Sequence, residues 1–197
     1  IQEKEDEFGI EIYLVSDEPY RKIIFDDIKY SHIFNYHKRA IVATSHSKDL
    51  ALPGERIGYI AVNPNCPDGE ELLDGLVFCN RTLGFVNAPA LIQYLVAHLQ
   101  DTTIDVGLYE KKRNYLYEAL TNMGYSLIKP QGAFYMFPKA PIKDDVLFTE
   151  KLKQNKVLVV PGSGFGLPGY FRISYCLDDS TILGSLPGLE KAILEYR

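Results

Sequence analysis

The sequence contains little cysteine, and its cysteines are dispersed. Cys66, Cys79 and Cys176 are the three cysteines in 197 residues, and no two of them form a Cys-x-x-Cys pair. An odd number of distant cysteines argues against a disulfide framework and favours a reducing compartment, so we expect a cytoplasmic protein. The histidines are not spaced from these cysteines as zinc ligands are, and we expect no metal site. They are His32, His37, His46 and His98.

The sequence also lacks a long apolar run and an excess of basic residues. Its most apolar stretch, residues 85–99, is interrupted by Asn87, Pro89 and Gln93 and is too short to span a membrane. No signal peptide is recognisable. The 21 lysines and arginines are outnumbered by 26 aspartates and glutamates, which gives a net charge of -5. This balance argues against nucleic acid as the main partner, because phosphate backbones attract basic surfaces. We expect neither a membrane nor a nucleic-acid partner.

What the sequence does have is an ordinary globular composition, 46% hydrophobic and 24% charged. Residues 1–8 have the character of a helix end closed by Gly9, and this start without methionine leads us to expect a truncated chain. Short apolar runs bounded by turn residues predict strands, and apolar residues at helical spacing predict helices. In the first half, the strands are predicted at 10–15, 40–44 and 57–62, and the helices at 70–80 and 89–99.

The second half predicts a long helix followed by shorter elements. Residues 104–123 have a helical apolar pattern that ends at Gly124, a residue type common at the C-terminal ends of helices. Gly184 and Pro187 are expected to interrupt the last helix. The other elements are a hairpin (125–128 with 133–137), a helix (146–155), two strands (157–160 and 170–175) and the last helix (179–196). Strands separated by helices indicate an α/β fold.

The segment after the second predicted strand carries the most specific pattern. It reads Ser45-His46-Ser47-Lys48 and is followed by Pro53-Gly54-Glu55-Arg56-Ile57-Gly58. This pattern of Ser-x-Ser-Lys and then Pro-Gly-x-Arg-x-Gly resembles the cofactor-lysine segment of class I/II aminotransferases of the aspartate-aminotransferase kind. The resemblance implies that Lys48 forms a Schiff base with pyridoxal 5'-phosphate (PLP) and later carries the proton. Considered alone, a lysine after a strand is more often an exposed surface residue.

Five other residues match the family's pattern in order and rough spacing. The resemblance implies that Asp17 pairs with the ring nitrogen of PLP and that Tyr20 donates to its phenolic oxygen. PLP accepts electrons well only when that nitrogen is protonated, which gives the carboxylate a chemical purpose. By the same resemblance Arg56 and Ser45 bind the phosphate, and Arg172 binds the substrate α-carboxylate. The structural alternatives are a strand-end turn, polar residues at a strand edge and, for Arg172, an internal ion pair.

The chains of this family are far longer than the present one. Their first half carries a Gly/Ser phosphate loop, an aromatic residue that stacks on PLP and an Asn-Pro segment, and none of these has a counterpart here. The resemblance therefore implies a C-terminal half, with residues 1–103 belonging to the mixed sheet of the PLP-binding large domain. Residues 104–197 would form the α/β small domain.

The resemblance implies the function of the parent protein as well. It would be a homodimeric aminotransferase that moves an amino group between an amino acid and a 2-oxo acid, and this fragment would be inactive alone. Two alternatives stay open. The same cofactor and lysine also serve β-lyases, decarboxylases and racemases, and the same fold can serve a non-catalytic domain that senses PLP or amino acids. The sequence does not name the amino donor.

Overall fold

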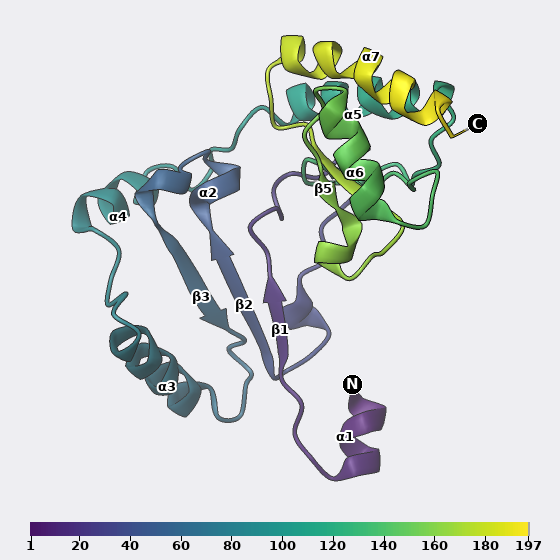
Figure 1. Ribbon diagram of the computed structural model, residues 1–197. Helices are drawn as coiled ribbons and strands as arrows, with labels where there is room; N and C mark the ends of the chain where they lie inside the picture. The colour runs from purple at the N-terminus through teal and green to yellow at the C-terminus, as the bar shows by residue number, and fades with distance from the viewer. Residues whose placement is uncertain (197) are drawn as a thin grey trace. The chain divides into compact units, whose positions relative to one another are not determined.

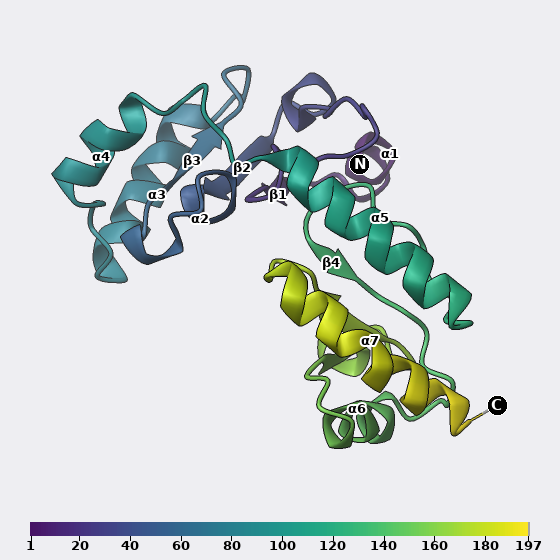
Figure 2. The ribbon, with the colours of Figure 1, turned by 90° about the horizontal axis from the view of Figure 1, so that it is seen from above.

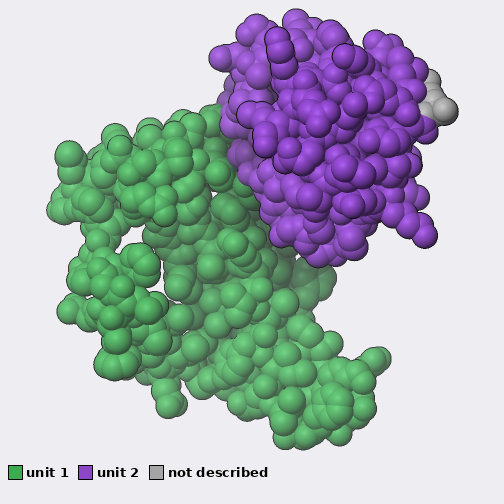
Figure 3. All heavy atoms as spheres, in the orientation of Figure 1, with its two compact units in different colours: residues 1–104 green, residues 105–197 purple. Residues whose placement is uncertain are grey.

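The computed structural model, drawn in Figure 1, describes residues 1–196. The chain divides into two compact units, residues 1–104 and residues 105–197 (Figure 3). Each unit combines helices with a three-stranded sheet. The predicted α/β fold class is therefore confirmed.

The sheet of unit 1 has the strand order β1-β2-β3 (Figure 1). The strands are β1 (Leu14–Asp17), β2 (Ala40–Ser45) and β3 (Gly58–Val62). β1 runs parallel to β2, and β3 runs antiparallel to β2. Because β1 and β2 are parallel, their carboxyl ends lie at the same edge of the sheet. Ala40, Ile41 and Val42 of β2 are buried, as expected for a central strand that forms the core of this unit.

Helices and turns surround this sheet. The helices of unit 1 are α1 (Gln2–Phe8), α2 (His46–Asp49), α3 (Gly69–Thr82) and α4 (Ala90–Ala97). Two 3-10 turns, η1 (Ile33–Asn35) and η2 (Pro53–Glu55), lie on either side of β2 in the chain. α1 ends at Gly9, whose φ of 63° is the left-handed value that favours glycine at a helix C-terminus. The helices predicted at 1–8, 70–80 and 89–99 are thus confirmed, with small shifts of their ends.

The first strand begins later than the sequence predicts, at residue 14 instead of residue 10. Side chains occupy the backbone groups that a longer strand would need. The Ile12 amide donates to Glu5 Oε1 at 2.9 Å, and the Ile12 carbonyl lies 2.7 Å from His37 Nε2. These local bonds compete with the sheet for the same donor and acceptor.

Unit 2 has a second sheet, in the strand order β4-β6-β5, and all its pairs are antiparallel. The strands are β4 (Tyr135–Met136), β5 (Val160–Pro161) and β6 (Phe171–Ser174), with the 3-10 turn η3 (Gly162–Phe165) after β5. The helices are α5 (Val106–Asn122), α6 (Asp145–Gln154) and α7 (Asp179–Leu194), and α7 contacts both α5 and α6 (Figure 2). Phe148, Phe171 and Tyr125 are buried in the core, with ring centroids 5.3 to 6.3 Å apart.

The predicted hairpin of residues 125–128 and 133–137 is wrong. β4 pairs with β6, so that Tyr135 lies opposite Ser174 and Met136 opposite Ile173. Tyr125 is buried, and its hydroxyl donates to the Leu189 carbonyl at 2.8 Å, which directs this segment toward α7. The turn residues between 128 and 133 suggested that the two flanking segments pair with each other, but contacts with residues distant in sequence decided the partner of β4.

The predicted interruption of the last helix is also wrong, because α7 runs from Asp179 to Leu194 through Pro187. Leu189 and Ile193 are buried on the side that packs into unit 2. The free energy gained by burying these side chains outweighs the cost of a proline in a helix interior, which is about 3 kcal/mol because one hydrogen bond is lost. None of the helices in residues 1–196 has the length and apolarity that a membrane span requires.

Candidate functional site

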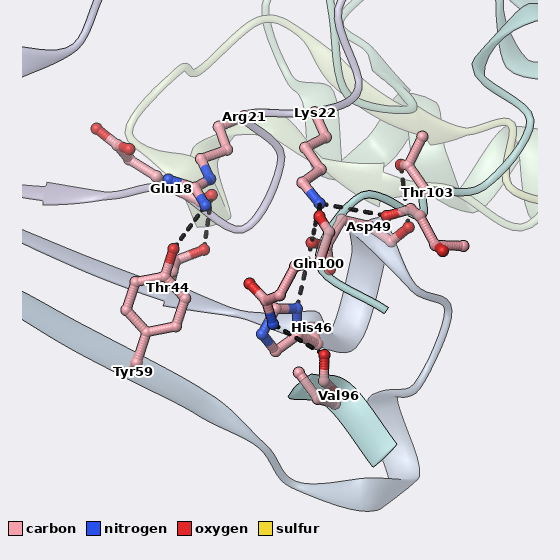
Figure 4. A network of polar contacts seen from close by, with 11 residues as sticks. Glu18, Arg21, Lys22, Thr44, His46, Asp49, Tyr59, Val96, Gln100 and Thr103 are labelled. Atoms are coloured by element: carbon pink, nitrogen blue, oxygen red, sulfur yellow. Dashed lines mark hydrogen bonds and ion pairs between the residues drawn. The ribbon is translucent and has the colours of Figure 1, made fainter. Parts of the chain in front are cut away.

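The carboxyl ends of β1 and β2 form the edge at which most candidate residues of unit 1 gather. β1 ends at Asp17 and β2 ends at Ser45. α2 begins directly after β2, so Lys48 is the third residue of this short helix. The Thr44 hydroxyl donates to the Glu18 carbonyl at 3.0 Å and joins the two strand ends (Figure 4). Asp17 and the Lys48 turn thus lie at one edge of the sheet, where α/β proteins commonly bind ligands.

Asp17 and Ser45 share one face of this sheet. Asp17 lies directly opposite Ala43, and Ser45 is two residues further along β2. Side chains alternate between the faces of a sheet, so these three residues project to the same side. Tyr20 belongs to the same edge, since Lys48 Nζ lies 6.0 Å from the centre of its ring. Asp17 is exposed and the other polar residues are half-buried, which leaves a carboxylate, an amine and two hydroxyls within reach of solvent.

Arg56 lies at the end of η2, in a left-handed conformation with φ of 50°. Its Nη1 donates to the Pro53 carbonyl at 2.8 Å, and its side chain is exposed. Together with Tyr59, it lines a hollow of about 550 Å³ beside β2 and β3. Close packing explains why the last residue of the motif, Gly58, is a glycine, because a Cβ there would collide with the Thr44 carbonyl. The motif thus combines a guanidinium at the surface with a close approach of two strands.

Arg172 belongs to β6 in unit 2. Its guanidinium lies 4.5 Å from the centre of the Tyr135 ring and 4.1 Å from that of the Phe165 ring, as in cation–π contacts. Among residues 1–196, no carboxylate lies within ion-pair distance of it. The internal ion pair considered as the structural alternative is therefore not formed within the described chain. A half-buried guanidinium between two aromatic rings keeps hydrogen-bond donors for an external anion.

A carboxylate next to Asp17 was not singled out from the sequence. Glu18 is buried, and its Oε2 has no hydrogen-bond partner among the described residues. Burial, and after it the neighbouring Glu18 carboxylate, raise the pKa of Tyr30 to about 12. The strand end therefore carries an exposed carboxylate and, one residue on, a buried one. Strand alternation could have suggested this difference, since Asp17 and Glu18 project to opposite faces.

A polar network at α2 was also not singled out from the sequence. It joins Lys22 to His46 and Asp49 of this helix (Figure 4): His46 Nδ1 lies 3.2 Å from Asp49 Oδ2, and Lys22 Nζ lies 3.8 Å from the same oxygen. His46 and Asp49 are both buried. Their spacing of three residues on a helix was a signal available in the sequence. The position of Lys22 beside them was not predictable in this way.

The structure thus brings four of the six candidate residues to one sheet edge and places Arg56 on the neighbouring turn. Asp17, Tyr20, Ser45 and Lys48 form the group at the edge. Arg172 belongs to the other unit. Residues 1–196 contain no cluster of three or more His, Cys, Asp or Glu side chains placed to hold a metal ion.

Comparison with known proteins identifies the family. The family model for aminotransferase class I and II matches residues 9–183 of this chain. A probable aspartate aminotransferase of Methanocaldococcus jannaschii is 33% identical over 93% of this chain and 50% of its own length. Aromatic-amino-acid aminotransferase 2 of Thermococcus litoralis is 31% identical over 97% of this chain and 52% of its own length.

A solved structure shows the same relation. The crystal structure of an amino transferase from Eubacterium rectale superposes with a TM-score of 0.95 and 44% identity, covering 100% of this chain and 49% of that one. The chain therefore spans about half the length of the relatives that it matches. Because the family match extends over most of the sequence, the chain belongs to the aminotransferase class I and II family.

Proposed function

We propose that the chain forms part of the active site of a PLP-dependent aminotransferase, which moves an amino group between an amino acid and a 2-oxo acid. One observation carries the proposal: Asp17 and the turn that holds Lys48 lie at one sheet edge in a member of an aminotransferase family. Relatives named as aspartate and aromatic-amino-acid aminotransferases support this reaction class.

The polar groups at this edge fit PLP by their chemistry. An exposed carboxylate suits a protonated ring nitrogen, and an amine suits an aldehyde. The Arg56 guanidinium and the Ser45 hydroxyl suit a phosphate, since arginine binds phosphate oxygens in a bidentate manner. Tyr20, whose ring lies 6.0 Å from Lys48 Nζ, supplies a hydroxyl beside the amine. We assign Asp17, Tyr20, Ser45, Lys48 and Arg56 to the cofactor on this basis.

The central role belongs to Lys48. When bound, PLP supplies the aldehyde that captures amino groups and a ring that accepts electrons. The Lys48 amine would hold the cofactor, and it is also the base suited to take the proton from the substrate Cα. The Asp17 carboxylate would pair with the ring nitrogen. Arg172, which has no carboxylate partner among residues 1–196, would bind the α-carboxylate that all amino-acid substrates share.

The two units fit two parts of such an enzyme. We assign unit 1 to the PLP-binding large domain and unit 2 to the small domain. The chain spans about half of its relatives, so the rest of the cofactor cradle would come from residues outside it. A homodimer in the cytoplasm remains a prediction of the resemblance.

The replacement Lys48→Ala in the full-length protein tests the function. We expect the variant to lose the visible absorbance of bound PLP and to lose transamination by about 10²–10⁴-fold or more, because the amine serves both attachment and proton transfer. Measurement of the absorbance and of the half-reaction with several amino acids, followed by product analysis, gives both results.

Lys38→Ala, at an exposed lysine of the same unit, is the matched control and should leave both readings unchanged. A Lys48→Ala variant that keeps its absorbance and turnover would reject the role of this lysine. Products of β-elimination or decarboxylation in place of a 2-oxo acid would retain the cofactor assignment but replace the transaminase reaction.

A further inference from the structure

The short helix that carries Lys48 is held by a distant segment of unit 1. α2 has only four residues, and its N-cap residue Ser45 makes no capping hydrogen bond with its side chain. A single turn of helix is not stable by itself, so contacts from outside determine where it lies. Two of them come from residues 103 and 104. Ile104 N donates to the Asp49 carbonyl at 2.9 Å. Thr103 Oγ1 donates to the same oxygen at 3.1 Å (Figure 4).

Lys22 joins the same two segments with its side chain. Its ammonium donates to the Gln100 carbonyl at 2.9 Å and to the Thr102 carbonyl at 3.2 Å, and it lies 3.8 Å from Asp49 Oδ2. Figure 4 shows the Lys22 side chain pointing toward Asp49 and Gln100. One cation thus contacts the carboxylate of α2 and two carbonyls of the segment that leads to α5 in the chain. The ammonium therefore donates two hydrogen bonds and forms one longer ion pair.

Burial makes this cation necessary. Asp49 and His46 are 5% and 6% exposed, and Asp49 Oδ1 has no hydrogen-bond partner among residues 1–196. A buried carboxylate is costly unless it is paired, and His46 offers one contact, at 3.2 Å from Oδ2. Lys22 is the lysine within ion-pair distance of Asp49 in the described chain, and its side chain is only 28% exposed. The carboxylate and the ammonium therefore depend on each other.

We propose that Lys22 and Asp49 are positioning residues for Lys48: they tie residues 100–104 to α2 and so fix the turn from which the Lys48 amine projects. This inference rests on the proposed function, in which Lys48 holds the cofactor. Lys48 directly precedes Asp49, so a shift of the Asp49 backbone moves Lys48 as well. Residues 100–104 are the last of unit 1, so the tie joins the point where the chain leaves this unit to the helix that carries Lys48.

The replacement Lys22→Met in the full-length protein tests the tie. Methionine retains the apolar stem and removes the charge and its donors. In the protein freed of PLP, we expect the Ile104 amide to exchange its hydrogen about tenfold faster, because one charged contact holds this segment. We expect PLP added to the same protein to react with Lys48 several-fold more slowly, because the amine is less well oriented. Lys22→Arg should restore both values in large part.

Lys151→Met is the matched control. Lys151 pairs with Glu195 in unit 2 at 2.5 Å, and its side chain is also 28% exposed. It should leave both measurements unchanged. Asp49→Asn, which removes the other charge, should act in the same direction as Lys22→Met, and circular dichroism establishes that each variant is folded.

The outcomes separate the tie from the function. Unchanged exchange at Ile104 in both variants would overturn the tie. Faster exchange with an unchanged rate of PLP attachment would show a structural bond only and overturn the positioning role. If PLP does not attach to Lys48 in the unaltered protein, the proposed function fails and the positioning role fails with it, whereas the exchange result still reports the tie.

Discussion

Asp145 holds a loop of unit 2 through a single carboxylate. It is the first residue of α6 and is 4% exposed. Its Oδ2 accepts a hydrogen bond from the Ser163 amide at 2.7 Å, in the turn η3. This backbone bond is the main reason why the pKa of Asp145 is lowered from its ordinary value. The charged form is also favoured by its place in the first turn of a helix.

The stability of unit 2 should therefore depend on pH through Asp145. Its pKa is lower in the folded chain than in the unfolded one, so its contribution is present above the ordinary value of 3.8. That contribution is lost as the pH falls through the lowered pKa. Asp145→Asn should lower the urea midpoint at pH 7, and its difference from the unaltered chain should shrink at pH 3. Asp178→Asn, at an exposed N-cap without a side-chain cap bond, is the control. A difference that stays the same at both pH values would contradict the assignment.

α7 shows how packing sets the residue type within one element. It contains two glycines in different surroundings. A Cβ on Gly188 would lie 2.5 Å from the Asn155 carbonyl oxygen and 2.6 Å from a Val157 methyl group, whereas a Cβ on Gly184 would meet nothing within 4 Å. Gly188 therefore allows α7 to approach the segment after α6, and Gly184 has no such role.

Replacement of each of these two glycines by alanine should have opposite effects on the stability of unit 2. Gly188→Ala is expected to destabilise unit 2 by about 1–3 kcal/mol, because the added methyl group forces the backbone apart. Gly184→Ala is expected to stabilise it by about 0.5–1 kcal/mol, the ordinary gain of alanine over glycine in a helix. Urea unfolding followed by circular dichroism measures both. Equal effects of the two replacements would mean that the close approach at Gly188 has no energetic weight.

At the scale of the whole chain, unit 1 exposes much apolar surface. No residue of α3 is buried. The large apolar side chains more than half exposed between residues 77 and 94 are Val77, Phe78, Leu83, Phe85, Leu91 and Tyr94. β1 and β3 each have only β2 as a neighbour among the described residues. Exposed apolar patches and open strand edges favour association.

The chain by itself should bind PLP weakly and have no transaminase activity. Arg56 and Ser45 can meet a phosphate, but a major part of an anion cradle is usually formed by the amides of a helix start. An aromatic ring stacked on the cofactor would add about 0.5–1.5 kcal/mol, and none is recognisable for that role in the sequence. Titration of the purified chain with PLP, followed by an amino-acid half-reaction, measures both properties. Tight stoichiometric binding with turnover would show that the chain is sufficient.

The exposed apolar side chains and open strand edges of unit 1 also predict that the purified chain associates with itself. Sedimentation should show this association at micromolar concentration.

The sequence by itself was sufficient for the features that depend on neighbours in the chain. The helix ends at Gly9 and Gly124 follow from the left-handed φ of 63° and 87° that glycine adopts readily. The strand over 40–44, the α/β class and the family also followed from the sequence, because the Ser-x-Ser-Lys and Pro-Gly-x-Arg-x-Gly pattern is local. The roles of Asp17, Lys48 and the other candidate residues remain predictions.

Only the tertiary structure decided the features that depend on residues far apart. β4 pairs with β6 instead of forming a hairpin, and α7 continues through Pro187, because burial of side chains outweighs local turn and helix preferences. The contact between Lys22 and the Gln100 carbonyl joins residues 78 apart in the sequence. No periodicity or spacing reports such a contact, since it forms only when the chain has folded and the buried charge of Asp49 requires a partner.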